Sequence, residues 1–276
     1  MIELPEAIVI SEQLNQTILG KRVKSVVADA SPHKFAWYFG DPSGYDALLR
    51  GRTIGTTRAF GCRVETEAEG AALSFGEGVN LRYFDAGAKL PAKHQLLMVF
   101  DDGSALAASI VMYGGIWAFP SGAMDGEHYY KVSKEATPPL SDGFDYDRFA
   151  SLLDEKSVKL SAKAFLATEQ RIPGLGNGVL QDILLNARIH PRRKMGALSD
   201  AQIRGMYDSV KGTLAEMVAG GGRDTEKDIF GDKGGYKTKL SKNNATMTCP
   251  DCGGGVRKEA YLGGSVYYCP LCQEAP

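Results

Sequence analysis

Two pairs of cysteines near the C-terminus constrain the fold of this chain more than any other feature of its sequence. They are Cys249 with Cys252 and Cys269 with Cys272, and 16 residues separate the two pairs. Two C-x-x-C pairs at this distance are typical of a tetrahedral four-cysteine zinc site, in which no coordination position remains for water. The sequence therefore predicts one structural zinc ion held by these four thiolates.

The segment between the two cysteine pairs has to leave the metal and return to it. Its residues favour a β-hairpin, with one strand near Val256–Tyr261, a turn at Gly263-Gly264 and a second strand at Val266–Tyr268. We therefore expect a β-hairpin zinc finger over residues 244–276.

The length and composition of the chain predict a globular protein of more than one domain. It has 276 residues, of which 43% are hydrophobic and 24% charged, and such a length exceeds what one core usually takes. No run approaches ~18 consecutive apolar residues, so no membrane span is expected. The start, MIELPEAIVI, carries acidic residues where a secretory signal would carry basic ones. We expect a cytoplasmic protein.

The charge of the chain is unevenly distributed. Residues 1–155 carry 14 Lys and Arg against 21 Asp and Glu, a balance of −7, and residues 156–276 carry 18 against 12, a balance of +6. The net charge of −1 hides a basic C-terminal half. Such asymmetry points toward a polyanionic partner, although an ordinary scatter of surface charge is the alternative.

The first residues predict a helix that leads into a β-rich region. Pro5 suits a first helical turn, Glu3 and Glu6 complement its positive end, and Gly20 ends it. Short apolar runs separated by glycine-containing turns follow about every ten residues, which favours a β-sandwich within residues 1–122. The expected strands are Arg63–Glu67, Ala72–Phe75, Leu81–Phe84, Leu96–Phe100 and Ala105–Val111.

The pattern becomes helical after a segment rich in proline and glycine, which we interpret as a linker over residues 123–144. Residues 145–243 then predict a helical domain and a polar, glycine- and lysine-rich loop. The whole chain is therefore expected to be an α+β multidomain protein. The expected helices are Phe149–Leu153, Leu160–Ala167, Val179–Ala187 and Ile203–Met217.

A short turn in the helical part predicts a phosphate site. The segment Pro173-Gly174-Leu175-Gly176-Asn177 joins two expected helices, and its small residues allow close approach of a phosphate to the backbone. The N–H groups and dipole at the start of the second helix, with the amide of Asn177, would favour an anion there. Plain punctuation between two helices is the alternative for this turn.

Taken together, these motifs resemble the formamidopyrimidine-DNA glycosylase/endonuclease VIII family. The resemblance rests on the Glu3–Glu6 segment (ELPE), the PGLGN turn followed by Ile189-His190-Pro191, and the cysteine hairpin, and it covers essentially the whole chain. It implies that residues 145–243 form a helix-two-turn-helix DNA-binding domain. It also implies a monomer that binds damaged double-stranded DNA, located in the cytoplasm at the nucleoid.

The resemblance implies base-excision repair by a DNA glycosylase with AP lyase activity. Such enzymes attack the sugar C1′ with their N-terminal amine, form a Schiff base and then cut the strand by elimination. Ile2 stands where the family has its nucleophile, Glu3 matches the acid beside it and Glu6 a second carboxylate. An α-amine with a reference pKa of ~8 is partly neutral near pH 7, as a nucleophile must be.

The resemblance also implies which residues contact DNA. Asn177, Lys163 and His94 stand at positions where the family contacts phosphate. The identification predicts that the helix start at Asn177 and the metal-bound hairpin grip the same sugar–phosphate chain.

Four positions depart from the family pattern. Ile2 replaces the usual N-terminal proline, and Cys62 replaces a lysine on a strand. Gly264 replaces the arginine of the hairpin that binds phosphate. The position of the apolar residue that the family inserts into the base stack falls near Glu77. Three hypotheses therefore remain open. The chain is an active glycosylase, a damaged-DNA binding protein of the same fold that has lost the chemistry, or a zinc-ribbon protein that contacts RNA or a protein.

Overall fold

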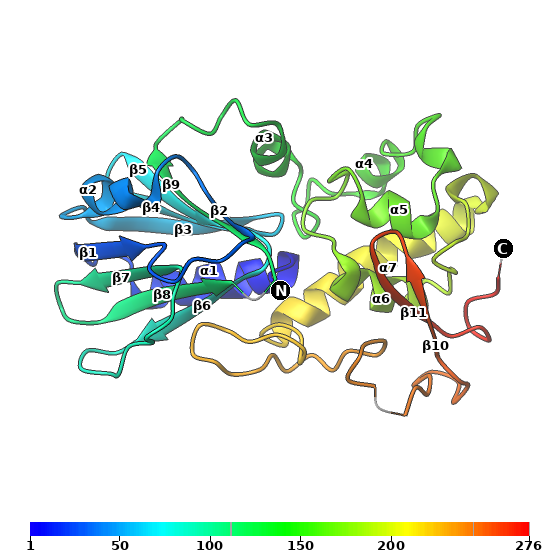
Figure 1. The fold of residues 1–276 in the computed structure, drawn as a ribbon. Coiled ribbons are helices and arrows are strands. Elements are labelled where there is room, and N and C mark those ends of the chain that lie inside the picture. Colours follow the sequence, from blue (N-terminus) through cyan, green and yellow to red (C-terminus); the bar gives the residue numbers. More distant parts are fainter. Residues whose placement is uncertain (111, 245, 276) are drawn as a thin grey trace. The chain divides into compact units, whose positions relative to one another are not determined.

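The computed structural model describes residues 1–110, 112–244 and 246–275, and the chain divides into two compact units (Figure 1). Unit 1 comprises Met1–Lys131 and Glu226–Gly234, and unit 2 comprises Val132–Thr225 and Gly235–Pro276. A short loop from the C-terminal half thus folds with the first unit. The finer division at residues 122, 144 and 243 stays a prediction.

Unit 1 begins with helix α1 (Leu4–Thr17), whose start contains the acidic residues and the proline expected from the sequence. Glu3 is the N-cap residue and makes a capping box with Glu6, so that each side chain accepts a hydrogen bond from the backbone of the other. Pro5 lies in the first turn. Leu14, which is fully buried, packs into the core of the unit.

Two sheets form the β-sandwich that the sequence predicts (Figure 1). Their facing side chains make the core together with α1. Met98 and Leu106 contribute from one sheet, and Val64 and Phe75 from the other. The antiparallel four-stranded sheet has the order β1 (Val23–Ala28), β7 (Leu96–Phe100), β8 (Ala105–Ile110), β6 (Val79–Phe84). The five-stranded sheet has the order β2 (Ala36–Tyr38), β9 (Gly114–Pro120), β5 (Ala71–Phe75), β4 (Arg63–Ala68), β3 (Ile54–Phe60).

The five strands expected from the sequence correspond to β4, β5, β6, β7 and β8, with ends that differ by two residues at most. The last residue expected in β8, Val111, lies outside the described residues. Strands β1, β2, β3 and β9 were not individually expected, nor was the short helix α2 (Tyr45–Leu49) that follows a 3-10 turn at Pro42–Gly44. Strand β2 pairs in parallel with β9, whereas the other pairs in this sheet are antiparallel.

Helix α3 (His128–Glu135) lies within the predicted linker. The sequence analysis did not predict this helix because the surrounding residues are rich in proline and glycine. Unit 2 then contains the four helices that the sequence predicts, with shifted ends. They are α4 (Tyr146–Ala150), α5 (Ala162–Ala167), α6 (Asn177–Asn186) and α7 (Asp200–Ala219), with 3-10 turns at Ser157–Lys159 and Met195–Ala197.

The C-terminal hairpin consists of β10 (Arg257–Tyr261) and β11 (Gly264–Tyr268). Its turn lies at Leu262-Gly263, one residue earlier than expected, and both turn residues have positive φ. That conformation is typical of two-residue hairpin turns. Across the described ranges, no helix combines the length and the apolar character that crossing a membrane requires.

Candidate DNA interface and active site

The four cysteines of the hairpin form a structural zinc site. Their Sγ atoms all lie within 4.8 Å of one another, with 3.9 Å between Cys249 and Cys272 and 3.5 Å between Cys252 and Cys269. Sulfur atoms about 2.3 Å from a tetrahedral zinc ion would be about 3.8 Å apart, so the donor set fits the metal. The cofactor prediction is therefore confirmed, and the metal would fix both ends of the hairpin.

Helices α5 and α6 hold the hairpin in place. The side chain of Gln181 on α6 accepts a hydrogen bond from the backbone N–H of Tyr267. Lys163 on α5 is 2% exposed, its ammonium group donates to the carbonyl oxygen of Tyr261, and burial lowers its pKa. Lys163 therefore contacts the hairpin turn with the same group that was expected to contact phosphate.

The start of α6 lies directly against the hairpin turn. Asn177 is the first residue of α6, and a Cβ atom added to Gly264 would lie 2.3 Å from its Nδ2. A side chain at position 264, such as the arginine of the family pattern, would have to displace the Asn177 amide. Within the described chain, Asn177 Oδ1 is buried without a hydrogen-bond partner, so this oxygen can still accept a hydrogen bond from a donor group.

Unit 2 thus brings together residues that are far apart in the sequence. Lys163, Asn177 and the turn at residues 261–264 meet at one place. The remaining expected phosphate contact, His94, lies in unit 1. It is half-buried, its Nδ1 lies 3.1 Å from the carbonyl oxygen of Pro91, and its backbone N–H donates to Ser31.

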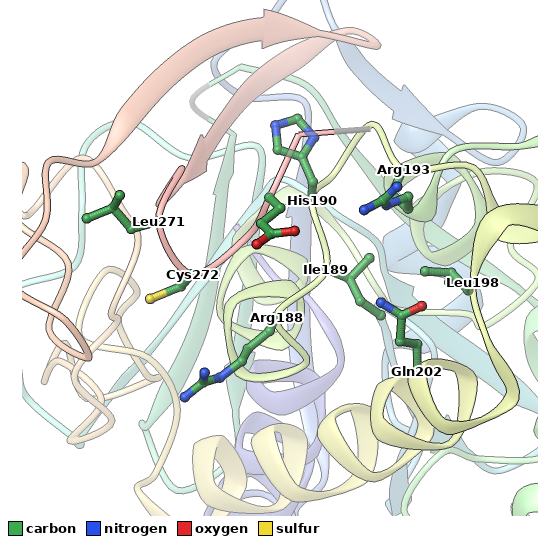
Figure 2. Close-up of a pocket in the computed structure, with 9 residues that line it drawn as sticks. Arg188, Ile189, His190, Arg193, Leu198, Gln202, Leu271 and Cys272 are labelled. Carbon is green, nitrogen blue, oxygen red and sulfur yellow. The ribbon is translucent and has the colours of Figure 1, made fainter.

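A cavity of about 260 Å³ (Figure 2) lies at the other end of α6. A helix of this length, at 1.5 Å per residue, puts that end about 15 Å from Asn177. Arg188, His190 and Arg193 line it together with Cys272 of the second cysteine pair. Two arginines therefore line a cavity away from the hairpin turn, together with the acidic Glu274.

The expected catalytic residues gather at the N-terminus in unit 1. Glu3 and Glu6 are 3% and 4% exposed, and Glu6 accepts a hydrogen bond of 3.2 Å from the backbone N–H of Glu3. Ile2 is 3% exposed and belongs to the apolar core. The terminal amine of Met1 forms an ion pair with Glu226.

A second group of polar side chains lies beside the N-terminus. The hydroxyl group of Tyr113 donates to Glu77 over 3.0 Å and lies 3.4 Å from the sulfur of Met1. Burial raises the pKa of Glu77, and burial next to Glu77 raises the pKa of the Cys62 thiol to about 11. Glu77 therefore belongs to a polar cluster at the candidate active site, and the Cys62 thiol is neutral near pH 7.

Only glycine allows the loop that carries Glu77 to lie so close to Tyr113. Gly78 has a φ of +83°, and a Cβ atom there would lie 1.7 Å from the carbonyl oxygen of Tyr113. The backbone approach at Gly78 thus positions the Glu77 carboxylate against the tyrosine hydroxyl.

The loop Glu226–Gly234, here called the returning loop, contributes a site residue that the sequence reasoning missed. Asp228 accepts a hydrogen bond of 2.8 Å from Gln13 on α1, and Ile229 is fully buried in the core of unit 1. These anchors place Glu226 at the Met1 amine. The adjacent apolar residues Ile229 and Phe230, within an otherwise polar segment, are the signal that could have revealed the anchor.

Comparison with solved structures defines the fold. The fold matches Lactococcus lactis Fpg in complex with DNA containing an abasic site, with a TM-score of 0.82 and 23% identity over 99% of this chain and 100% of that chain. The MutM (Fpg) protein of Thermus thermophilus gives a TM-score of 0.81 at the same identity and coverage. The fold is that of Fpg-type DNA glycosylases, and the α+β prediction is confirmed.

Sequence relatives establish the family, although no protein-family model matches the chain. The formamidopyrimidine-DNA glycosylase of Pelotomaculum thermopropionicum is 31% identical over 196 residues, covering 68% of this chain and 69% of that protein. That of Alkalilimnicola ehrlichii is 29% identical over 285 residues, covering 99% and 100%. This chain belongs to the formamidopyrimidine-DNA glycosylase family, as its motifs indicate.

Proposed function

We propose that this protein is a monomer that binds damaged double-stranded DNA and excises a lesion base through its N-terminal amine. The convergence of Lys163, Asn177 and the hairpin turn in unit 2 carries the proposal. Membership of the family supports it, since the solved complexes of Lactococcus lactis Fpg contain DNA with an abasic site or with Fapy-dG.

In this proposal the start of α6 binds the sugar–phosphate chain. A helix N-terminus favours a phosphate through its dipole and backbone N–H groups, and the Asn177 amide adds a donor beside them. The hairpin turn lies against that amide, so a strand held by Asn177 would also run past the turn. The balance of +6 over residues 156–276 would favour such a partner.

The chemistry would take place at the N-terminus. The amine attacks the sugar C1′, its lone pair forms the new C–N bond, and the bond from C1′ to the base breaks. The departing base takes the bonding electrons and a proton, and the buried carboxyl group of Glu3 would donate that proton. Glu6 would position Glu3 through the capping box. The C1′–O4′ bond of the sugar then breaks, a proton passes from the amine to O4′ and the Schiff base forms. Elimination from the opened sugar cuts the strand.

The Met1–Glu226 ion pair bears directly on this step. A paired ammonium has no lone pair to donate, so the amine has to lose its proton before it attacks C1′. Glu226 would be the nearest carboxylate to accept that proton. If Met1 is removed, the N-terminal amine is that of Ile2, a residue that belongs to the apolar core of unit 1.

Borohydride trapping tests the proposal. Intact mass first fixes whether the amine belongs to Met1 or Ile2. The protein is then incubated with duplexes that carry an abasic site, 8-oxoguanine or an oxidised pyrimidine, and a covalent adduct at the N-terminal residue is expected. Glu3→Gln should remove base excision, whereas Glu12→Gln, an exposed carboxylate on the same helix, is the matched control and should retain it.

A second function is favoured by one group of observations. The amine is paired with Glu226, and the strand lysine of the family is replaced by Cys62, whose thiol has a raised pKa. A damaged-DNA binding protein without catalysis would keep unit 2 and would need neither a free N-terminal amine nor the strand lysine. No adduct on any duplex, together with retained tight binding to damaged DNA, would establish that function instead.

A further inference from the structure

Three large apolar side chains are exposed beside the candidate active site. Phe35 is 47% exposed, Trp37 52% and Met112 65%. Large apolar side chains exposed on neighbouring segments mark interaction sites more often than scattered single residues do. We call these three residues the apolar platform.

The backbone of the five-stranded sheet holds the platform together. Strand β2 pairs in parallel with β9, which sets Trp37 opposite Gly115. The N–H of Gly114 donates to the carbonyl oxygen of Phe35 over 3.0 Å. Strand β2 lies at the edge of this sheet, and no strand of the described ranges pairs with its outer side.

Tyr113 connects the platform to the candidate active site. Its ring lies 5.9 Å from that of Trp37 at an interplanar angle of 46°, and its hydroxyl group donates to Glu77 beside Met1. Met112 is its neighbour in the chain. Tyr113 therefore contacts the platform through its ring and the N-terminal residue Met1 through its hydroxyl group.

Basic character accompanies the aromatic residues. The ammonium group of Lys34 lies 5.3 Å from the centre of the Phe35 ring, and His33 lies edge-on to the same ring at 6.4 Å. Aromatic faces interleaved with cations are the combination that binds unstacked bases, because every base has a π-face and every nucleotide a phosphate.

We propose that the apolar platform of Phe35, Trp37 and Met112 receives a nucleobase of the bound DNA that is unstacked next to the lesion. The inference rests on the proposed function and extends it to a surface of unit 1. The Glu77 carboxylate is held by Tyr113 and is unsuited to insertion among stacked bases. The platform instead offers an exposed apolar surface on which an unstacked base would lie.

Tryptophan fluorescence and affinity together test the inference. The chain has two tryptophans, and Trp117 is half-buried with the guanidinium carbon of Arg63 4.0 Å from its ring centre. A duplex with a tetrahydrofuran abasic-site analogue should quench the emission of the wild type and leave that of Trp37→Phe unchanged. Trp37→Ala should weaken binding about 5- to 150-fold, the range for loss of one base stacked on an aromatic side chain. Met112→Ala, which removes an apolar contact, should also weaken binding.

A matched control and a salt titration separate stacking from other causes. Leu19→Ala removes an apolar side chain that is 53% exposed at the end of α1, and binding should not change. No cation is lost in Trp37→Ala, so the slope of log Kd against log salt should equal that of the wild type.

Affinity of Trp37→Ala and Met112→Ala within twofold of the wild type, with unchanged Trp37 emission, would overturn the inference and leave the proposed function standing. A wild type without preference for the damaged duplex would overturn both. Self-association of the wild type that Trp37→Ala abolishes, with no effect on DNA binding, would assign the platform to a second copy and also overturn the inference.

Discussion

Replacing Gly264 with alanine should weaken DNA binding by displacing Asn177 rather than by removing a contact of its own. The new Cβ atom would lie 2.3 Å from Asn177 Nδ2, well inside van der Waals contact. The amide is the end of a side chain and rotates away at little cost, whereas the hairpin backbone is fixed by the metal and by Gln181. The substitution therefore removes the Asn177 donor from the phosphate site.

The magnitude follows from the bond that is lost. A hydrogen bond to a charged group contributes about 1.5–3 kcal/mol, which corresponds to about 10- to 150-fold in Kd. Asn177→Ala should give a loss of the same size. Since Gly264 does not have positive φ, an alanine there is compatible with the strand, and the free energy of unfolding should change by less than about 1 kcal/mol.

The assay is fluorescence anisotropy with a duplex that carries an abasic-site analogue, measured for both single variants and for the double variant. The double variant should bind like Asn177→Ala alone, because the amide is already gone. Gly255→Ala is the matched control, since a Cβ atom at Gly255 meets no atom within 4 Å. Its affinity should equal that of the wild type.

Two results would refute this reasoning. One is wild-type affinity of Gly264→Ala. The other is a double variant whose loss equals the sum of the two single losses, which would mean that Gly264 and Asn177 act independently.

Three further predictions concern the metal, a buried carboxylate and the lone thiol. The protein should contain one zinc ion by elemental analysis, and chelation should abolish DNA binding because the metal supplies most of the hairpin's folding free energy; normal binding by Cys252→Ala would contradict this. Asp182→Ala leaves the N–H groups of Lys239 and Leu240 without their buried acceptor and should cost about 2–6 kcal/mol in urea unfolding, unlike exposed Asp208→Ala. Burial raises the pKa of the Cys62 thiol from 9.0 to about 11, so the thiol of the unfolded chain loses its proton at lower pH than that of the folded chain. The free energy of unfolding of the wild type relative to Cys62→Ala should therefore fall between pH 9 and 11. A difference independent of pH would contradict this prediction.

Much of the fold was predictable because its signals are local. Metal-binding cysteines have a fixed spacing, capping residues act within one turn, and strands such as β7 alternate between buried and half-buried side chains. The zinc hairpin, α1 and the β-sandwich follow from these signals. Their ends shift by a few residues because tertiary contacts decide where each element stops.

The returning loop was not predictable in the same way. Its placement depends on Ile229 entering the core of unit 1 and on Asp228 meeting Gln13, more than 200 positions away in the sequence. A polar, glycine-rich segment carries no periodicity that reveals such an anchor. Glu226 consequently becomes a site residue through a contact that only the three-dimensional structure contains.

The surroundings of the charged residues were also beyond the sequence. A lysine that matches a phosphate-contacting position is equally able to hold a carbonyl group, and Lys163 does so at the hairpin turn. In the sequence Glu77 looks like an ordinary loop carboxylate. In the structure the close backbone approach at Gly78 lets Glu77 accept a hydrogen bond from Tyr113. Burial and partners decide the role of such groups, and both are tertiary properties.

The central claim, recognition of damaged DNA, is tested most directly by the affinity of the zinc-loaded protein for two duplexes of one sequence, one intact and one with a single abasic-site analogue. Measured across a range of salt, the damaged duplex should bind at least about tenfold more tightly, a difference of about 1.4 kcal/mol, with similar salt slopes for the two. Equal affinity for both duplexes at every salt concentration would contradict the account.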